Sequence, residues 1–157
     1  MPSVLFVCTA NRFRSPLAEA AFKQCLNDDG CLEDWDVWSA GTWTESGLPP
    51  ATGALKAARR LGLDIERHRS QSITSDLLLR SDLVIVMQAS QQEAILVDFP
   101  HVAGKTMLLS EIVEGITYDI PDPIETLDGS DQELATVICN LVKQGYKQIC
   151  VMAQKRR

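Results

Sequence analysis

The chain has 157 residues, of which 45% are hydrophobic and 23% are charged, and its formal net charge at pH 7 is −6. These values are typical of a globular protein with one sizeable core, and the length is short for two. The negative charge argues against a general nucleic-acid binder or membrane-surface protein, and no apolar stretch approaches the ~18 residues of a membrane-spanning helix.

The five cysteines do not form the dense framework of a disulfide-stabilised secreted domain. We therefore expect one domain over residues 1–157, located in the cytoplasm.

The first predicted strand, Val4–Cys8, ends in a short polar loop, and a helix is expected directly after that loop. Ser15 is a good N-cap residue and Pro16 suits the first helical position, so the sequence predicts a helix over Pro16–Asn27. The free N–H groups and positive dipole end of that helix point back into the loop, which can then cradle a tetrahedral oxyanion such as phosphate. The backbone groups expected to bind the anion are those of Thr9, Ala10, Asn11, Arg12, Phe13, Arg14 and Ser15.

Cys8 and Arg14, six positions apart, are the two chemically active side chains of this loop. A guanidinium can bind two oxygens of an anion at once. The pKa of a cysteine thiol at a helix N-terminus or beside arginine falls from ~8.5 to roughly 3.5–7.5. We therefore predict that Cys8 is a thiolate nucleophile at neutral pH. The alternative is a small buried hydrophobe, which suits a lone cysteine but does not account for the loop, arginine and helix that follow.

Short apolar segments alternate with helical patterns along the rest of the chain. The further strands are Asp36–Ser39, Leu83–Met87 and Thr106–Leu109, and the further helices are Pro50–Leu61, Ser90–Val97 and Asp131–Gln144. This alternation predicts an α/β fold: a three-layer open sheet of about four parallel strands with helices on both faces. Ligands of such sheets bind beyond the C-terminal strand ends, where Cys8 lies.

The last predicted helix has its own start and stop signals. Ser130 is the expected N-cap, and Glu133 is in place for a capping box. Gly145 is expected to end the helix. The apolar pattern of Tyr146–Ala153 does not decide between helix and strand.

A proline-rich segment, Tyr118–Pro123, supplies two candidate acids, Asp119 and Asp122. The flanking prolines hold Asp122 extended. Attack on a phosphate ester expels an alkoxide or phenoxide, and a positioned acid that protonates it contributes typically ~10²–10⁴ in rate. The alternative role is that of a turn aspartate that bonds only nearby backbone.

The run from Val4 to Ala18 resembles the signature of the low-molecular-weight protein-tyrosine phosphatases, in which Cys, five residues, Arg, Ser and usually Pro lie near the N-terminus. The resemblance continues in the same order through Ser39–Thr42, Pro49–Pro50, His68 and Asp122-Pro123. It implies a phosphomonoester hydrolase, a protein-tyrosine phosphatase, that works through a cysteinyl-phosphate.

The resemblance also assigns individual roles. Cys8 is the implied nucleophile, Arg14 the phosphate-binding group, and Asp122 the general acid and then the base that activates water. Asn11 is implied to bond to Ser39 and His68 and so to fix the loop. Ser15 is implied to donate its hydroxyl to the Cys8 sulfur, a role that competes with N-capping, while His68 can equally be an ordinary partly buried histidine.

Five positions depart from the family pattern. Phe13 stands where many members carry a second cysteine that traps the oxidised nucleophile. Ile124 and Glu125 stand where an aromatic residue commonly walls the phenol pocket; we expect Ile124 to form part of this wall and Glu125 to repel acidic peptides if it faces the cleft. Trp43 is either a second wall or an ordinary surface or core residue, and Arg12 either attracts the anion or faces solvent.

The expected substrate is a phosphotyrosine protein or a small aryl phosphate. The enzyme is expected to act as a monomer, with no cofactor, metal, nucleic acid or membrane insertion. Two alternatives remain: an arsenate reductase-like enzyme on the same loop, and a catalytically silent phosphate-binding regulatory module. The thioredoxin-coupled reductase needs two more cysteines near Leu83–Met87, but no cysteine occurs between Cys31 and Cys139.

Overall fold

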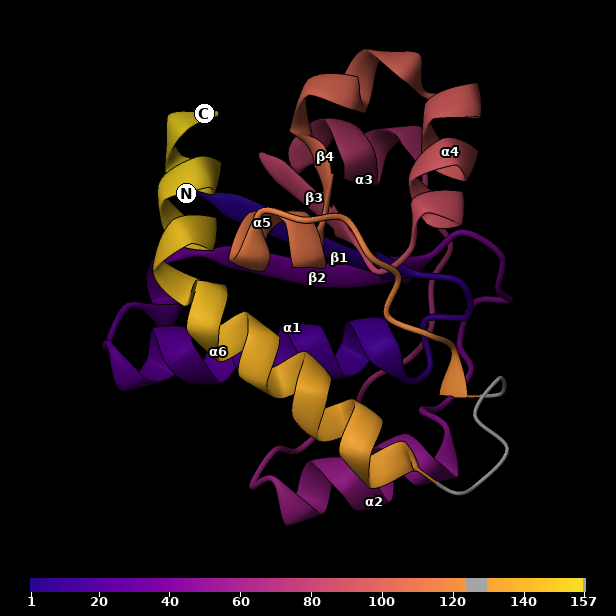
Figure 1. Ribbon diagram of the computed structural model, residues 1–157, viewed down its shortest axis with the longest axis vertical. Coiled ribbons are helices and arrows are strands. Elements are labelled where there is room, and N and C mark those ends of the chain that lie inside the picture. The colour runs from indigo at the N-terminus through magenta and orange to yellow at the C-terminus, as the bar shows by residue number, and fades with distance from the viewer. Residues whose placement is uncertain (124–129, 157) are drawn as a thin grey trace.

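Four parallel strands form a sheet in the order β2-β1-β3-β4 in the computed structural model, which describes residues 1–123 and 130–156 (Figure 1). The strands are β1 Ser3–Cys8, β2 Asp36–Gly41, β3 Leu83–Val86 and β4 Thr106–Leu108. Val4 of β1 pairs with Val37 of β2 on one side and with Leu83 of β3 on the other. The predicted α/β sheet is therefore confirmed, and Cys8 ends a strand that has a neighbour on both sides.

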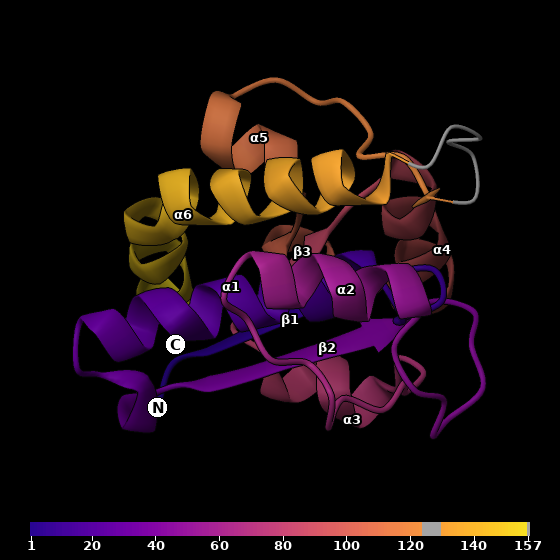
Figure 2. The same cartoon turned by 90° about the horizontal axis from the view of Figure 1, so that it is seen from below.

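Helices cover both faces of the sheet (Figures 1 and 2). The α-helices are α1 Arg14–Asp28, α2 Thr52–Arg60, α3 Ser75–Arg80, α4 Ala89–Asp98, α5 Leu109–Glu114 and α6 Asp131–Lys155, and the 3₁₀ helices are Leu32–Asp34 and Pro100–Lys105. Val4 and Phe6 of β1 belong to the core with α1, α2, α5 and α6. Leu5 and Val7 point to the opposite core, which α3 and α4 cover, because successive strand residues face opposite sides.

The first helix begins earlier than the sequence predicts. Its N-cap residue is Phe13 and its first residue is Arg14, so the prediction of Ser15 as the N-cap is wrong. The chain turns sharply at Asn11, the one described non-glycine residue with a positive φ, +57°. This left-handed residue lets the helix start before Ser15, whose hydroxyl then lies inside the first turn and faces the loop.

The last helix is longer than predicted, because Gly145 does not end it. Gly145 is buried within α6, where Val113 of α5 packs so closely that a Cβ on Gly145 would overlap its Cγ2. The glycine thus permits close helix packing instead of a C-cap, and Tyr146–Ala153 is helical. Ser130 is the N-cap residue as predicted, but its side chain makes no capping hydrogen bond. Its φ of −80° and ψ of 24° differ from the extended backbone that the predicted capping box requires.

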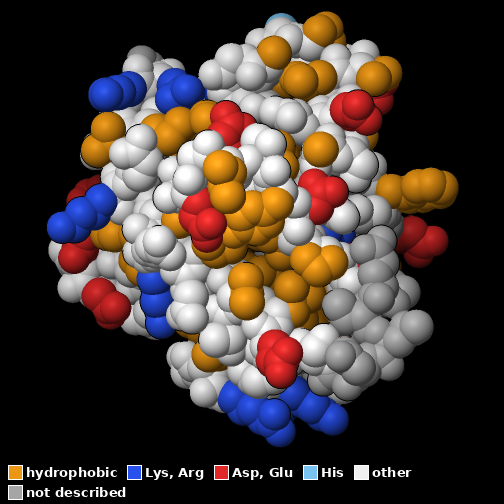
Figure 3. Space-filling view, viewed as in Figure 1, with side chains coloured by type: hydrophobic (Ala, Val, Ile, Leu, Met, Phe, Trp, Pro, Cys, Tyr) orange, Lys and Arg blue, Asp and Glu red, His pale blue; other side chains and the backbone are white. Residues whose placement is uncertain are grey.

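Two kinds of side chain gather on the face shown in Figure 3. Hydrophobic groups lie over α5 and the segment after it, where Ile116 and Tyr118 are exposed. Basic groups lie over α2, whose last turn holds Arg59 and Arg60. No helix in the described part of the chain has the length and apolar character needed to cross a membrane.

Candidate active site

Cys8 lines a pocket of about 280 Å³ that brings together residues far apart in the sequence. Arg12 lines it from the loop after β1, Arg14 lines it from the start of α1, and Asp122 lines it from the Tyr118–Pro123 segment. Gly53 of α2 and Asp131 of α6 complete one side. The proposed nucleophile, anion-binding arginine and acid therefore share one pocket.

The sulfur of Cys8 is held by two polar neighbours although the residue is only 2% exposed. The Oγ of Ser15 lies 3.0 Å away, and the backbone N–H of Asn11 donates to the sulfur at 3.3 Å. The N-terminus of α1 begins beside them at Arg14, and its first N–H groups have no partner within the helix. This setting suits a negatively charged sulfur or an oxyanion bound next to it.

Asn11 determines the shape of the loop. Its Nδ2 donates to Ser15 Oγ at 2.8 Å and to Ser39 Oγ at 3.0 Å, while its Oδ1 accepts the N–H of Gln71 at 3.0 Å. The Nε2 of His68 lies 2.7 Å from the Asn11 carbonyl oxygen. The structure therefore brings Ser39 and His68 onto Asn11, the arrangement that the resemblance implies.

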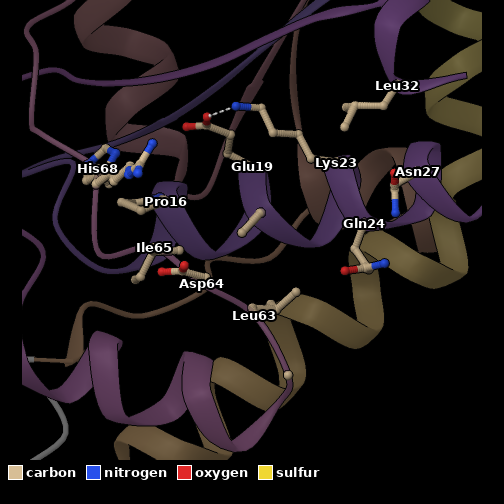
Figure 4. Close-up of a pocket in the computed structure, with 13 residues that line it drawn as sticks. Pro16, Glu19, Lys23, Gln24, Asn27, Leu32, Leu63, Asp64, Ile65 and His68 are labelled. Carbon is tan, nitrogen blue, oxygen red and sulfur yellow. Dashed lines mark hydrogen bonds and ion pairs between the residues drawn. The ribbon is translucent and has the colours of Figure 1, made fainter.

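A larger groove of about 550 Å³ lies behind this loop, between α1 and the chain after α2 (Figure 4). Glu19 lines it, accepts a hydrogen bond from Ser39 Oγ at 2.6 Å and pairs with Lys23 at 2.7 Å. His68 lines it as well. No cysteine is among the described residues that line this groove, and two of its polar residues connect to Asn11, His68 directly and Glu19 through Ser39. Sequence reasoning missed Glu19, whose only local signal is a Glu–Lys spacing of four on a helix.

The guanidinium of Arg14 is buried and fixed in direction. Its Nη1 donates to the Gln88 side-chain oxygen and to the Ile120 carbonyl oxygen, both at 2.8 Å. Its Nη2 lies 3.6 Å from Oδ2 of Asp122. Sequence reasoning also missed Gln88, although a polar residue directly after the predicted central strand Leu83–Met87 lies where ligands bind in such sheets.

The two candidate acids have different surroundings. Oδ1 of Asp119 accepts the N–H of Ala89, the first residue of α4, at 2.9 Å. Asp119 thus bonds a helix N-terminus, whereas Asp122 lines the pocket with Cys8. Within residues 1–123 and 130–156, no three His, Cys, Asp or Glu side chains are placed to hold a metal ion.

The end of β2 lies directly against the Cys8 loop. Trp43 and Thr42 donate their backbone N–H groups to the carbonyl oxygens of Thr9 and Cys8. A Cβ on Gly41 would overlap the Thr9 carbonyl oxygen, so this position requires glycine. The Ser39–Thr42 segment is therefore part of the loop's support.

Of the two residues predicted to form the substrate wall, Trp43 and Ile124, the structure describes only Trp43. The Trp43 side chain is 85% exposed and does not line the pocket. Ile124 and Glu125 lie outside the described residues. Phe13 is buried in the core, and Arg12 lines the pocket while its Nε donates to the Pro49 carbonyl oxygen at 2.8 Å.

The profile of the family described as low molecular weight phosphotyrosine protein phosphatase matches residues 3–157. The chain belongs to this family. It is 30% identical to the low molecular weight protein-tyrosine-phosphatase YfkJ of Bacillus subtilis, over 100% of this chain and 99% of YfkJ. It is 35% identical over 121 residues to the "Probable low molecular weight protein-tyrosine-phosphatase EpsP" of Ralstonia solanacearum, covering 77% of each chain. The crystal structure of the low molecular weight protein tyrosine phosphatase from T. tengcongensis superposes with a TM-score of 0.86 at 30% identity, over 94% of this chain and 99% of that one.

Relatives of this phosphatase also include enzymes named for other substrates. The protein-arginine-phosphatase of Geobacillus stearothermophilus is 30% identical over 90% of this chain and 94% of its own. Arsenate reductase 1 of Staphylococcus epidermidis is 38% identical, but over 54% of this chain and 58% of its own. Together with the absence of cysteine between Cys31 and Cys139, the shorter match favours the phosphatase interpretation over a reductase.

Proposed function

We propose that this phosphatase hydrolyses phosphotyrosine in proteins, or small aryl phosphates, through a phosphocysteine on Cys8. The observation that carries the proposal is the shared pocket of Cys8, Arg14 and Asp122, with Ser15 beside the sulfur. The reaction is a double displacement without a cofactor.

In the first step the Cys8 thiolate attacks phosphorus, and the bond from phosphorus to the leaving oxygen breaks. Asp122 gives its proton to that oxygen, so that a neutral alcohol or phenol departs. Arg14 and the N–H groups from Thr9 to Ser15 bind the three equatorial oxygens, whose charge they stabilise.

In the second step water attacks the phosphocysteine. Asp122, now a carboxylate, takes a proton from the water, and the sulfur–phosphorus bond breaks. The Ser15 hydroxyl donates a hydrogen bond to the departing thiolate. Inorganic phosphate is released and the original enzyme is regenerated.

Rapid-quench labelling with a ³²P-labelled aryl phosphate tests the intermediate. A covalent phosphoenzyme is expected in the wild type and is absent in Cys8→Ala. Turnover that persists in Cys8→Ala contradicts the proposal.

The acid is tested with a matched pair of variants. Asp122→Asn is expected to lower kcat by about 10²–10⁴, most strongly for poor leaving groups. Asp119→Asn keeps kcat within a small factor, because Asp119 bonds the start of α4. The reverse result assigns the acid to Asp119.

We also propose that the enzyme acts as a monomeric single domain in the cytoplasm. All five cysteines are unpaired, which supports a reducing compartment. Sedimentation velocity tests the monomer, and a panel of phosphotyrosine peptides against alkyl phosphates tests the aryl preference.

A further inference from the structure

The pocket contains a second carboxylate that the proposed mechanism does not use. Asp131 is the first residue of α6, and it lines the same pocket as Cys8, Arg14 and Asp122. No hydrogen bond or ion pair engages its carboxylate among residues 1–123 and 130–156, although the side chain is partly buried.

The position of the Asp131 carboxylate depends on a glycine in α2. Oδ2 of Asp131 lies so close to Gly53, the second residue of α2, that a Cβ on Gly53 would overlap it. The N-termini of α2 and α6 therefore lie close together, as Figures 1 and 2 show, and Gly53 and Asp131 both line the pocket. An acidic side chain at a helix N-terminus interacts favourably with the positive end of the helix dipole.

The other charged groups that line the pocket are already engaged. Arg14 is held for the phosphoryl group, and Asp122 faces Arg14 at 3.6 Å. Arg12 is drawn toward Pro49 by the hydrogen bond from its Nε. Among the described charged residues that line the pocket, Asp131 is therefore the one available to contact the part of the substrate beyond the phosphoryl group.

We propose that Asp131 is a specificity-determining residue that selects substrates carrying a positive charge beside the phosphorylated side chain. The inference rests on the proposed function, because the phosphoryl group must bind at Cys8 for the remainder of the substrate to pass Asp131. A lysine or arginine next to phosphotyrosine supplies the ion-pair partner that Asp131 lacks among residues 1–123 and 130–156. A glutamate next to phosphotyrosine places its negative charge near that of Asp131, which lowers the affinity for such peptides.

Three synthetic phosphotyrosine peptides that differ only in having Lys, Gln or Glu on both sides of the phosphotyrosine test this inference. Wild-type kcat/KM is expected to be about two- to fivefold higher for the Lys peptide than for the Glu peptide, the size of one exposed charge interaction. In Asp131→Asn the ratio is expected to approach one. Raising the salt concentration to 0.5 M is expected to lower the wild-type ratio, because salt screens such pairs.

Glu133→Gln is the matched control. It removes the same charge from the same first turn of α6, but Glu133 is exposed and does not line the pocket. It is expected to keep the wild-type ratio. Asp131→Ser is a second test variant, to be used if Asp131→Asn does not fold, because serine is also favoured at a helix start. Its Lys-to-Glu ratio of kcat/KM is likewise expected to approach one.

Three outcomes overturn the inference. They are a Lys-to-Glu ratio near one in the wild type, an unchanged ratio in both Asp131 variants, and an equal loss in Glu133→Gln, which assigns the effect to net charge alone. Hydrolysis of p-nitrophenyl phosphate separates these from failure of the proposed function. A wild type inactive on that small ester lacks the proposed chemistry, whereas an active one without peptide discrimination contradicts only the role of Asp131.

Discussion

The side-chain oxygen of Ser15 lies 3.0 Å from the sulfur of Cys8. The same oxygen accepts a hydrogen bond of 2.8 Å from the amide of Asn11. A hydroxyl that accepts from Asn11 has its own hydrogen available for the sulfur. Ser15 is therefore oriented as a donor to Cys8 before any substrate binds.

Ser15→Ala is expected to slow breakdown of the phosphocysteine more than its formation, because the thiolate then leaves without its donor. We expect kcat to fall by about 10²–10³-fold, as for loss of one preorganised donor. A pre-steady-state burst of p-nitrophenol, equal to the enzyme concentration, is expected in the variant and measured by stopped flow.

Ser39→Ala is the control for the Ser15 prediction. It also removes a partner of Asn11 but leaves the contact between Ser15 and Cys8 in place. A burst of equal size in both variants shows instead that Ser15 acts only by shaping the loop.

Gln88 is predicted to position Arg14. Gln88→Leu removes the side-chain oxygen that accepts from Nη1 of Arg14, leaving the Ile120 carbonyl as the acceptor for that nitrogen. We expect the inhibition constant of inorganic phosphate to rise by about 10- to 100-fold, because hydrogen bonds to charged groups contribute about 1.5–3 kcal/mol. Gln92 lies in the first turn of α4, the helix that Gln88 precedes, and bonds the Thr106 carbonyl oxygen, so Gln92→Leu is expected to leave the inhibition constant unchanged. Equal inhibition constants for wild type and Gln88→Leu contradict the prediction.

Alkaline pH is predicted to destabilise the fold through Cys139. Burial raises the pKa of this thiol from 9.0 to about 11, so the unfolded chain loses the proton first. Above pH 9 the unfolded state binds fewer protons than the folded state, and the free energy of unfolding falls until the pH reaches about 11. The loss from this residue is at most roughly 2–3 kcal/mol, from the 1.36 kcal/mol per unit of pKa shift.

Urea unfolding at pH 8, 9, 10 and 11 measures this loss. Burial also raises the pKa of Cys150 to about 11, which adds a decline in the same direction. At pH 8 Cys139→Ala is expected to be less stable than the wild type, because removing the sulfur leaves a cavity. Between pH 8 and pH 11 it is expected to lose less stability than the wild type does. Parallel curves for the two proteins contradict the role of Cys139.

The sequence allowed the central sheet and the Cys8 loop to be predicted because both follow from local patterns. Continuous apolar runs indicate buried parallel strands, and a cysteine, polar loop and helix in succession indicate an anion site. Gln88 and Glu19 could not be assigned in this way. Each acts on a side chain from another element, so its role depends on packing that the local pattern does not contain.

The two helix-boundary errors have the same physical origin. Ser15 and Gly145 both match strong local signals, for an N-cap and for a helix end. In the fold, Ser15 bonds Cys8 and Asn11, and Gly145 accommodates Val113. Tertiary contacts therefore outweighed the local preference at both positions.

Gly145→Ala is the substitution that tests this last contact. In an isolated helix alanine is favoured over glycine by about 1 kcal/mol, so the change would stabilise α6 if nothing packed there. Because the new Cβ overlaps Cγ2 of Val113, a stiff β-branched side chain, we expect a net destabilisation of about 1 kcal/mol. In a Val113→Ala background the obstacle is gone, and the same substitution is expected to stabilise the protein. Urea unfolding of the four proteins measures this reversal of sign, and a stabilising effect of Gly145→Ala with Val113 present would show that α5 yields to the added methyl group.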